Sequence, residues 1–131
     1  MTKKAWLSPL LLAVFMGVGG CRTAPIHNVR HSPVEMNKAD YSLEDVGKAI
    51  FRAGNSLGWQ MKIKKPGTMI GTLYQDSHMA QVAIDYNTRE YDITYQASKD
   101  LNYQAGKIHK NYNGWIEELD QAIHRELLSE M

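Results

Sequence analysis

Very short polar breaks separate four segments of alternating apolar and polar residues, and this spacing narrows the possible folds more than any other feature. The segments are Trp59 to Lys64, Thr68 to Tyr74, Met79 to Tyr86 and Glu90 to Gln96. Alternation with a period of two is typical of strands with one buried face. Connections of a few residues are too short for parallel crossovers, so adjacent strands must run antiparallel. The sequence therefore predicts a four-stranded antiparallel β-meander, with a type II turn at the Pro-Gly pair that ends in Gly67.

A helix is expected before the first strand, in the segment YSLEDVGKAIFRAGNSLGW. Ser42 can cap its amino terminus together with Asp45, which is a carboxylate form of the capping box. Apolar residues then recur three and four positions apart, as they do on one helix face: Leu43, Val46, Ile50, Ala53 and Leu57. Gly58 is suited to end the helix, because glycine adopts a positive φ without strain.

A second helix is expected to begin near Lys107 and to continue almost to the end of the chain. Its apolar stripe comprises Ile108, Tyr112, Trp115, Ile116, Leu119, Ala122, Ile123 and Leu127. Trp115 is expected in the core. Gly114 costs about 1 kcal/mol relative to alanine inside a helix, which close packing against the sheet would explain. With both helices packed on one face of the sheet, the predicted fold class is α+β with the element order α-β-β-β-β-α.

The amino terminus, MTKKAWLSPLLLAVFMGVGGC, is typical of an export signal. Lys3 and Lys4 supply the positive start, and the apolar stretch from Ala5 to Val18 is too short for a comfortable membrane span. The run VGGC that ends at Cys21 looks like the lipobox of bacterial lipoproteins, which implies cleavage after residue 20 and acylation of Cys21. The alternatives are an ordinary secretory signal followed by a chance cysteine and an uncleaved anchor helix.

This resemblance implies a protein that is anchored to a membrane through lipid and does not cross it. Arg22 follows the cysteine, whereas an aspartate there would resemble an inner-membrane retention signal. The expected location is therefore the bacterial outer membrane, on its periplasmic face. Cys21 is the only cysteine of the chain, so no intramolecular disulfide can form and lipidation accounts for the thiol.

Three parts of the chain are predicted: a signal peptide over residues 1–20, a lipidated cysteine with a flexible tether over residues 21–40, and a single α+β domain over residues 41–131. Two prolines and weak periodicity mark the tether. His27 and His31 stand four residues apart, as two metal ligands on one helix face do. Pro25 and Pro33 bracket them and disfavour a helix, so a solvated tether is the preferred interpretation.

The charge balance excludes one class of partner. Removal of the 20 leader residues from a chain of 131 leaves 111 residues, enough for one domain with a modest core. The leader takes two of the 15 basic residues with it, which leaves 13 basic against 14 acidic residues and a net charge of about −1. Such a balance gives no basic field for nucleic acid, so no nucleic-acid partner is expected.

The common enzyme templates do not fit the chain after the leader, which has no Gly-rich phosphate loop, HExxH, CxxC or serine nucleophile elbow. No catalytic residue, metal site or cofactor is therefore predicted. His109 and Asn113 lie one turn apart beside the stripe of the second helix, and we expect them to hydrogen-bond the backbone of the preceding loop, Ala97 to Lys107. Ligand binding by this pair is the alternative. A small envelope enzyme with His78 or His109 as its base is also kept open.

The uncovered face of the predicted sheet is the other candidate site. It is expected to present Lys62, Lys64, Thr68, Ile70, Thr72, Tyr74, Met79, Gln81 and Asp92. Lys62 and Tyr74 are the candidate binding residues there, for an envelope protein or a glycan strand. A contiguous apolar patch around Tyr74 would favour binding, whereas a merely solvated face would make the domain an accessory without a ligand.

The run SKDLNYQAGKIHKNYNGWIEEL, together with GW at Gly58, PG at Pro66 and the segment AQVAIDY, is similar to a family of small proteobacterial lipoproteins of unknown function. The resemblance covers about Tyr41 to Leu127. It implies a lipoprotein with one domain, and it transfers no functional residue. The function expected from the sequence is thus a membrane-anchored, periplasm-facing lipoprotein that serves as a non-enzymatic binding or accessory module of the cell envelope.

Overall fold

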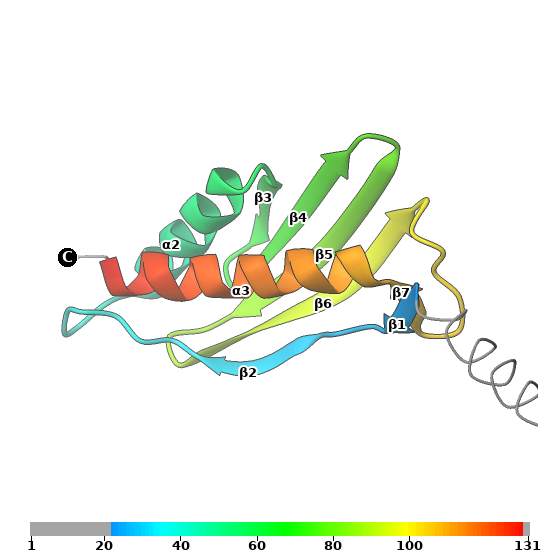
Figure 1. Cartoon of the computed structure of the whole chain (residues 1–131). Coiled ribbons are helices and arrows are strands. Elements are labelled where there is room, and N and C mark those ends of the chain that lie inside the picture. The colour runs from blue at the N-terminus through cyan, green and yellow to red at the C-terminus, as the bar shows by residue number, and fades with distance from the viewer. Residues whose placement is uncertain (1–21, 130–131) are drawn as a thin grey trace, which may run out of the picture.

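The computed structural model describes residues 22–129, which form two helices and seven strands (Figure 1). The elements are β1 (Thr23–Pro25), β2 (Val29–Pro33), α2 (Leu43–Ser56), β3 (Gln60–Lys65), β4 (Thr68–Gln75), β5 (His78–Tyr86), β6 (Glu90–Lys99), β7 (Lys107–His109) and α3 (Lys110–Ser129). The predicted signal peptide and Cys21 lie outside the described residues. Within residues 22–129, neither helix is long and apolar enough to cross a membrane.

The strands form two antiparallel sheets, so the predicted fold class of a four-stranded meander between two helices is wrong. β3, β4, β5 and β6 do follow one another close to the predicted ranges. However, β2 adds a fifth strand beside β6, which gives the order β2-β6-β5-β4-β3. β1 and β7 pair in a separate two-stranded sheet. Lys107–His109, expected to be the first turn of the second helix, is therefore a strand.

The amino-terminal segment belongs to the fold, and the predicted flexible tether is wrong for residues 23–33. β2 pairs with β6 and places Val29 and Ser32 in the interior, at 7% and 9% exposure. Val34 is buried beyond the end of β2, and its N–H donates to the Arg89 carbonyl at 2.9 Å. The two prolines stand at the last positions of β1 and β2, which are edge strands and tolerate the missing N–H. β1 and β2 are thus part of the folded domain.

α2 has the amino-terminal capping box that its sequence predicts. The Ser42 hydroxyl accepts from the Asp45 N–H at 3.1 Å, and the Asp45 carboxylate accepts from the Ser42 N–H at 2.9 Å. The bond from the Ser42 backbone is the main reason that the pKa of Asp45 lies below its usual value. Gly58 follows the helix with a φ of 91°, so the predicted glycine ending is also confirmed.

α3 is capped by the residue that precedes it, because the His109 Nδ1 accepts from the Asn111 N–H at 3.1 Å. The buried face of the helix comprises Tyr112, Ile116, Leu119, Ala122, Ile123 and Leu127. Trp115 is only half-buried, with the ring of His78 edge-on at a centroid distance of 6.5 Å. The predicted core position of Trp115 is therefore wrong, and Tyr112, which is 0% exposed, is the buried aromatic anchor.

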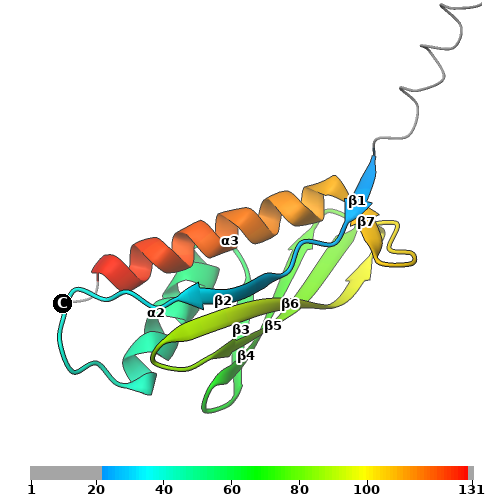
Figure 2. The same cartoon turned by 90° about the horizontal axis from the view of Figure 1, so that it is seen from below.

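α2 and α3 lie side by side across one face of the five-stranded sheet, which gives the domain two layers (Figures 1 and 2). The sheet contributes alternate residues to the core between them: Met69, Leu73, Ala80, Val82, Ile84, Tyr91 and Ile93. Along β5 and β6 these residues alternate with less buried ones, as the period of two in the sequence predicts for strands with one buried face. No other element of residues 22–129 covers the opposite face of this sheet.

Gly114 does not pack closely on the sheet, contrary to the expectation from the sequence. A Cβ at this exposed position would meet no heavy atom within 4 Å. Gly114→Ala is therefore expected to raise the free energy of unfolding by about 0.5–1 kcal/mol, because alanine loses less backbone entropy in a helix. Urea denaturation measures this change, and a loss of stability would contradict it. Gly47→Ala in α2 is the matched control and should destabilise, since its Cβ would lie 2.8 Å from the Tyr86 hydroxyl oxygen.

Candidate functional site

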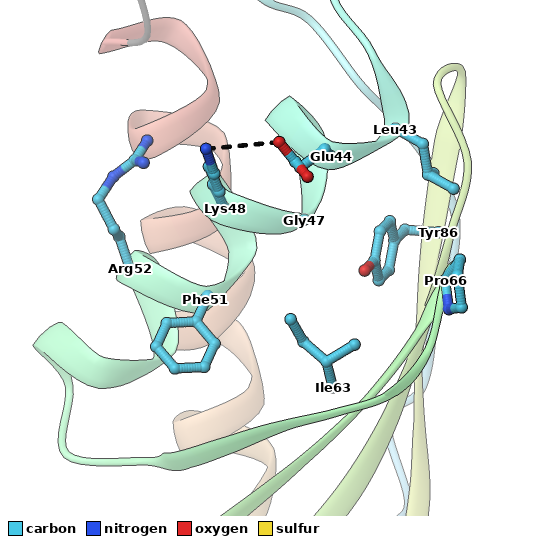
Figure 3. A pocket seen from close by; sticks show the side chains of 9 residues that line it. All are labelled: Leu43, Glu44, Gly47, Lys48, Phe51, Arg52, Ile63, Pro66 and Tyr86. Atoms are coloured by element: carbon cyan, nitrogen blue, oxygen red, sulfur yellow. Dashed lines mark ion pairs between the residues drawn. The ribbon is translucent and has the colours of Figure 1, made fainter.

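An apolar groove with a volume of about 660 Å³ lies between α2 and the edge strand β3 (Figure 3). Its apolar lining comprises Leu43, Gly47, Phe51, Ile63, Pro66 and Tyr86. Ile63 pairs across the strands with the buried Met69, so its side chain is on the helix-covered face of the sheet. Ile63 is nevertheless 56% exposed, because α2 and α3 leave this part of β3 uncovered. The groove is thus an apolar surface like that of the core, and no element of residues 22–129 covers it.

A close contact between α2 and β5 shapes the inner side of this groove. Gly47 faces Tyr86, and a Cβ on Gly47 would come within 3.3 Å of the tyrosine ring. The missing side chain lets the ring lie against the helix backbone, where Tyr86 is only 9% exposed. In Figure 3 the side chain of Ile63 lies between those of Phe51 and Tyr86. Because Gly47 has no side chain, the groove is deeper at this position. A larger residue there would fill this space.

Charged residues line the rim of the groove, and they are paired. The Lys48 Nζ lies 3.5 Å from the Glu44 carboxylate one turn earlier in α2. The Arg52 Nε donates to the Glu126 carboxylate of α3 at 2.9 Å. Exposed ion pairs of this kind contribute little to stability, but they balance the charge along the rim. The groove consequently offers apolar surface bordered by a row of compensated charges.

The side chains of His109 and Asn113 both make structural hydrogen bonds. The Asn113 Oδ1 accepts from the His27 N–H at 3.0 Å, and its Nδ2 donates to the Pro25 carbonyl, also at 3.0 Å. The His109 side chain accepts from the Asn111 N–H at the start of α3. The expectation that both side chains hydrogen-bond the backbone of the loop 97–107 is therefore wrong, because their partners lie elsewhere. Asn113 instead ties α3 to the segment between β1 and β2, and these bonds use the amide group that ligand binding would need.

Asn113→Ala is expected to lower the free energy of unfolding by about 1–2 kcal/mol, because it removes both bonds to the amino-terminal segment. Amide hydrogen exchange at His27 should become faster in the same variant. Asn111→Ala is the matched control, since Asn111 is an exposed asparagine of the same helix. Unchanged exchange at His27 in the Asn113 variant would contradict the structural role.

Tyr74 and Lys62 lie apart on the uncovered face. Tyr74 is 62% exposed and pairs with Met79, whereas Lys62 pairs with Ile70. The two pairs are four positions apart along β4, a distance of about 13 Å along the strand. Ile70 and Met79 are themselves half-buried. The structure therefore does not bring Lys62 and Tyr74 into one site, and both lie on the face of the sheet opposite α3, the helix that carries Asn113.

A serine, a histidine and an aspartate meet between β2 and α3, but not in the geometry of a catalytic triad. The Ser32 Oγ lies 3.1 Å from the His124 Nε2, and the Asp120 Oδ1 lies 3.6 Å from the same nitrogen. In a triad the carboxylate bonds the other ring nitrogen, which fixes the tautomer that can accept the serine proton. The Tyr91 hydroxyl donates to the Asp120 carboxylate, and burial raises the pKa of Tyr91. The cluster is a polar link between the sheet and α3.

His78 also has a local structural contact. Its Nδ1 lies 3.2 Å from the Gln75 carbonyl within the β4–β5 hairpin, and its ring packs against Trp115. His31 does not meet His27 on a helix face, because both belong to the extended segment around β2. His31 instead contacts carboxylates of β6, which raise its pKa, Glu90 most strongly. Among the described residues, His31 joins Glu90 and Asp92 in a group of potential metal ligands.

Comparisons with known proteins add no family or fold relative: no protein-family model, no curated protein and no solved structure matches the chain. The resemblance to small proteobacterial lipoproteins stays an expectation from the sequence.

Proposed function

We propose that this protein is a lipid-anchored accessory of the bacterial cell envelope, and that its groove between α2 and β3 binds an amphipathic helix of an envelope protein. The export signal that ends at Cys21 supports the anchor. One observation carries the binding function: Ile63 lies on the helix-covered face of the sheet and yet is 56% exposed, beside Phe51. An exposed apolar surface bordered by polar residues is typical of an interaction site.

A helix is the occupant that completes the layer. α2 and α3 already cover the neighbouring strands, and a third helix laid beside α2 would cover the inner face of β3 (Figure 1). Helices pack about 8–10 Å apart, so the apolar face of such a helix would meet Phe51 and Ile63 together. Glu44, Lys48 and Arg52 recur every four residues along the rim of α2. An apolar seam bordered by polar residues is the kind of surface on which the apolar face of an amphipathic helix packs.

A glycan strand suits this groove less well than a protein helix. Sugars present hydroxyl groups over most of their surface, and these groups lose hydrogen bonds with water where the wall is apolar. The groove offers mainly the side chains of Leu43, Phe51, Ile63 and Pro66. Its charged groups already have partners, since Lys48 pairs with Glu44 and Arg52 pairs with Glu126 of α3.

Photocrosslinking in intact cells tests the binding function. A photoreactive residue at position 63 should form an adduct with an envelope protein, and the crosslinked peptide should belong to an amphipathic helix. The matched control is the same residue at position 74, which is similarly exposed, at 62%, on the other face of the sheet. Phe51→Asp should abolish the adduct from position 63, provided that a thermal melt shows the variant to be folded.

Three results would overturn this function. An adduct from position 74 without one from position 63 would place the binding surface on the uncovered face. An adduct with a glycan would show that the partner is a carbohydrate and not a protein helix. Equal yields from positions 63 and 74, or none from either, would leave the groove without a binding role.

The anchor is tested independently of the groove. Cys21→Ser is expected to move the protein from the membrane fraction to the soluble fraction, because the thiol that carries the lipid is absent. The intact mass of the natural protein should show a diacylglyceryl group and an amide-linked acyl chain on Cys21. An unmodified Cys21 in the mature protein would contradict the lipid anchor.

A further inference from the structure

On the uncovered face of the sheet, one histidine and three carboxylates come together near the β5–β6 turn. Glu90 and Asp92 stand two residues apart on β6 and so point to the same face. Asp85 of β5 lies directly opposite Asp92 in the strand register. His31 joins them from β2, and the ligand atoms of His31, Glu90 and Asp92 all lie within 4.8 Å of one another.

An irregularity of β2 directs His31 into this cluster. The register between β2 and β6 shifts between Val29 and Ser32, and His31 has a φ of 55°. Bulges of this kind redirect a side chain relative to the regular alternation of the strand. The His31 Nδ1 lies 2.7 Å from the Glu90 Oε2, and the His31 backbone N–H donates to the Asp92 Oδ1 at 2.7 Å. Two neighbouring strands thus hold the imidazole and both carboxylates in place.

The cluster carries more negative charge than its contacts balance. Asp85 accepts a hydrogen bond from the Thr68 hydroxyl at 3.0 Å, and Glu90 contacts His31. Within residues 22–129, no lysine or arginine forms an ion pair with Asp85, Glu90 or Asp92. Like charges directly opposite each other in a sheet are destabilising. A recess of about 170 Å³ lies beside these three carboxylates, with room for a hydrated cation.

We propose that His31, Glu90 and Asp92 bind a divalent transition-metal cation of the Zn²⁺ type, with Asp85 in reach through a metal-bound water. An imidazole nitrogen with carboxylate oxygens suits Zn²⁺, whereas Ca²⁺ and Mg²⁺ prefer oxygen ligands alone. Zn²⁺ lies about 2.0–2.2 Å from such ligands, so small side-chain rotations bring all three onto one ion. Three protein ligands leave a position open to water, as expected at an exposed site. The sequence favoured no metal site because it paired His31 with His27 and not with the distant residues of β6.

Isothermal titration of the full chain in detergent with ZnCl₂ tests the site, with MgCl₂ and CaCl₂ as comparison titrants. We expect one Zn²⁺ per chain and much weaker binding of the other two cations. His31→Ala and Asp92→Asn should each weaken Zn²⁺ binding by about tenfold or more, since even outer partners of metal ligands have effects of that size. Asparagine can still accept the hydrogen bond from the His31 backbone, so Asp92→Asn should keep the fold.

His27→Ala is the matched control, because it removes an exposed histidine from the same segment without touching the cluster. It should leave the affinity for Zn²⁺ unchanged. Absence of Zn²⁺ binding to the natural chain would reduce the cluster to an ordinary histidine–glutamate ion pair and overturn the site. A loss of affinity in His27→Ala as large as in His31→Ala would also overturn it. Neither result bears on the groove, which lies on the other face of the sheet.

Discussion

Removal of residues 22–34 is expected to unfold the domain and not merely to shorten a linker. The deletion takes away β1 and β2, and with them the buried side chains of Val29 and Val34. Full burial of one such side chain contributes about 1.5–3 kcal/mol, so the two together contribute about 3–6 kcal/mol. Domains of this size have total stabilities of only about 5–15 kcal/mol. The deletion also leaves the backbone of β6 unpaired on its outer edge, where chains can aggregate.

Thermal unfolding of the natural and shortened proteins in the same detergent measures this effect. The double substitution Arg30→Ala and Glu35→Ala is the control, because both side chains are exposed in the same segment. It should melt close to the natural protein. A shortened chain with a cooperative transition near that of the natural protein would show that residues 22–34 do act as a tether.

Tyr112→Ala is expected to cost about 3–5 kcal/mol, the usual range for removing a large aromatic ring from a core. Tyr112 is 0% exposed, and its ring packs edge-on against Tyr95 at a centroid distance of 5.7 Å. The expected cost is a large part of the total stability, so the variant should be largely unfolded at moderate urea concentrations. Equilibrium urea denaturation followed by far-ultraviolet circular dichroism gives the free energy of unfolding.

Tyr112→Phe separates the ring from its hydroxyl group. The hydroxyl oxygen is buried and has no hydrogen-bond partner within the described residues, and burial raises the pKa of this phenol. An unsatisfied buried polar group costs about 1–3 kcal/mol, so its removal should leave the protein equally or more stable. A loss of more than about 1 kcal/mol in Tyr112→Phe would show that the hydroxyl has a partner, such as a buried water.

Local rules predicted the elements whose signals are local. Ser42 and Asp45 form the capping box because the bonds join residues three apart. The hairpin between β3 and β4 turns at Pro66 and Gly67, and Gly67 has a φ of 89°. β2 was not predicted from the sequence, for two reasons. Its register shift breaks the alternation of apolar and polar residues, and its partner, β6, is about sixty residues away in sequence. A segment of this kind becomes a strand only through a long-range pairing, which no local pattern reveals.

The candidate sites show the same division between local and long-range information. Phe51 lies off the apolar stripe predicted for α2, and this was the one signal in the sequence for a second apolar surface on that helix. The groove itself arises because two helices cover a sheet that β2 has widened to five strands. Asn113 was recognised as a hydrogen-bonding residue, but its partners at Pro25 and His27 lay in the presumed tether.

The start of β1 at Thr23 limits how far the domain can stand from a bilayer if Cys21 carries the lipid, since Arg22 alone separates the two. An extended chain spans about 3.3–3.6 Å per residue, which makes this separation about 7 Å. The β1–β7 end would then rest on the headgroups, and α2 lies toward the opposite end of the molecule (Figures 1 and 2). With so short a connection the groove would stay within a molecule's length of the membrane, and a partner would have to present its helix within that distance.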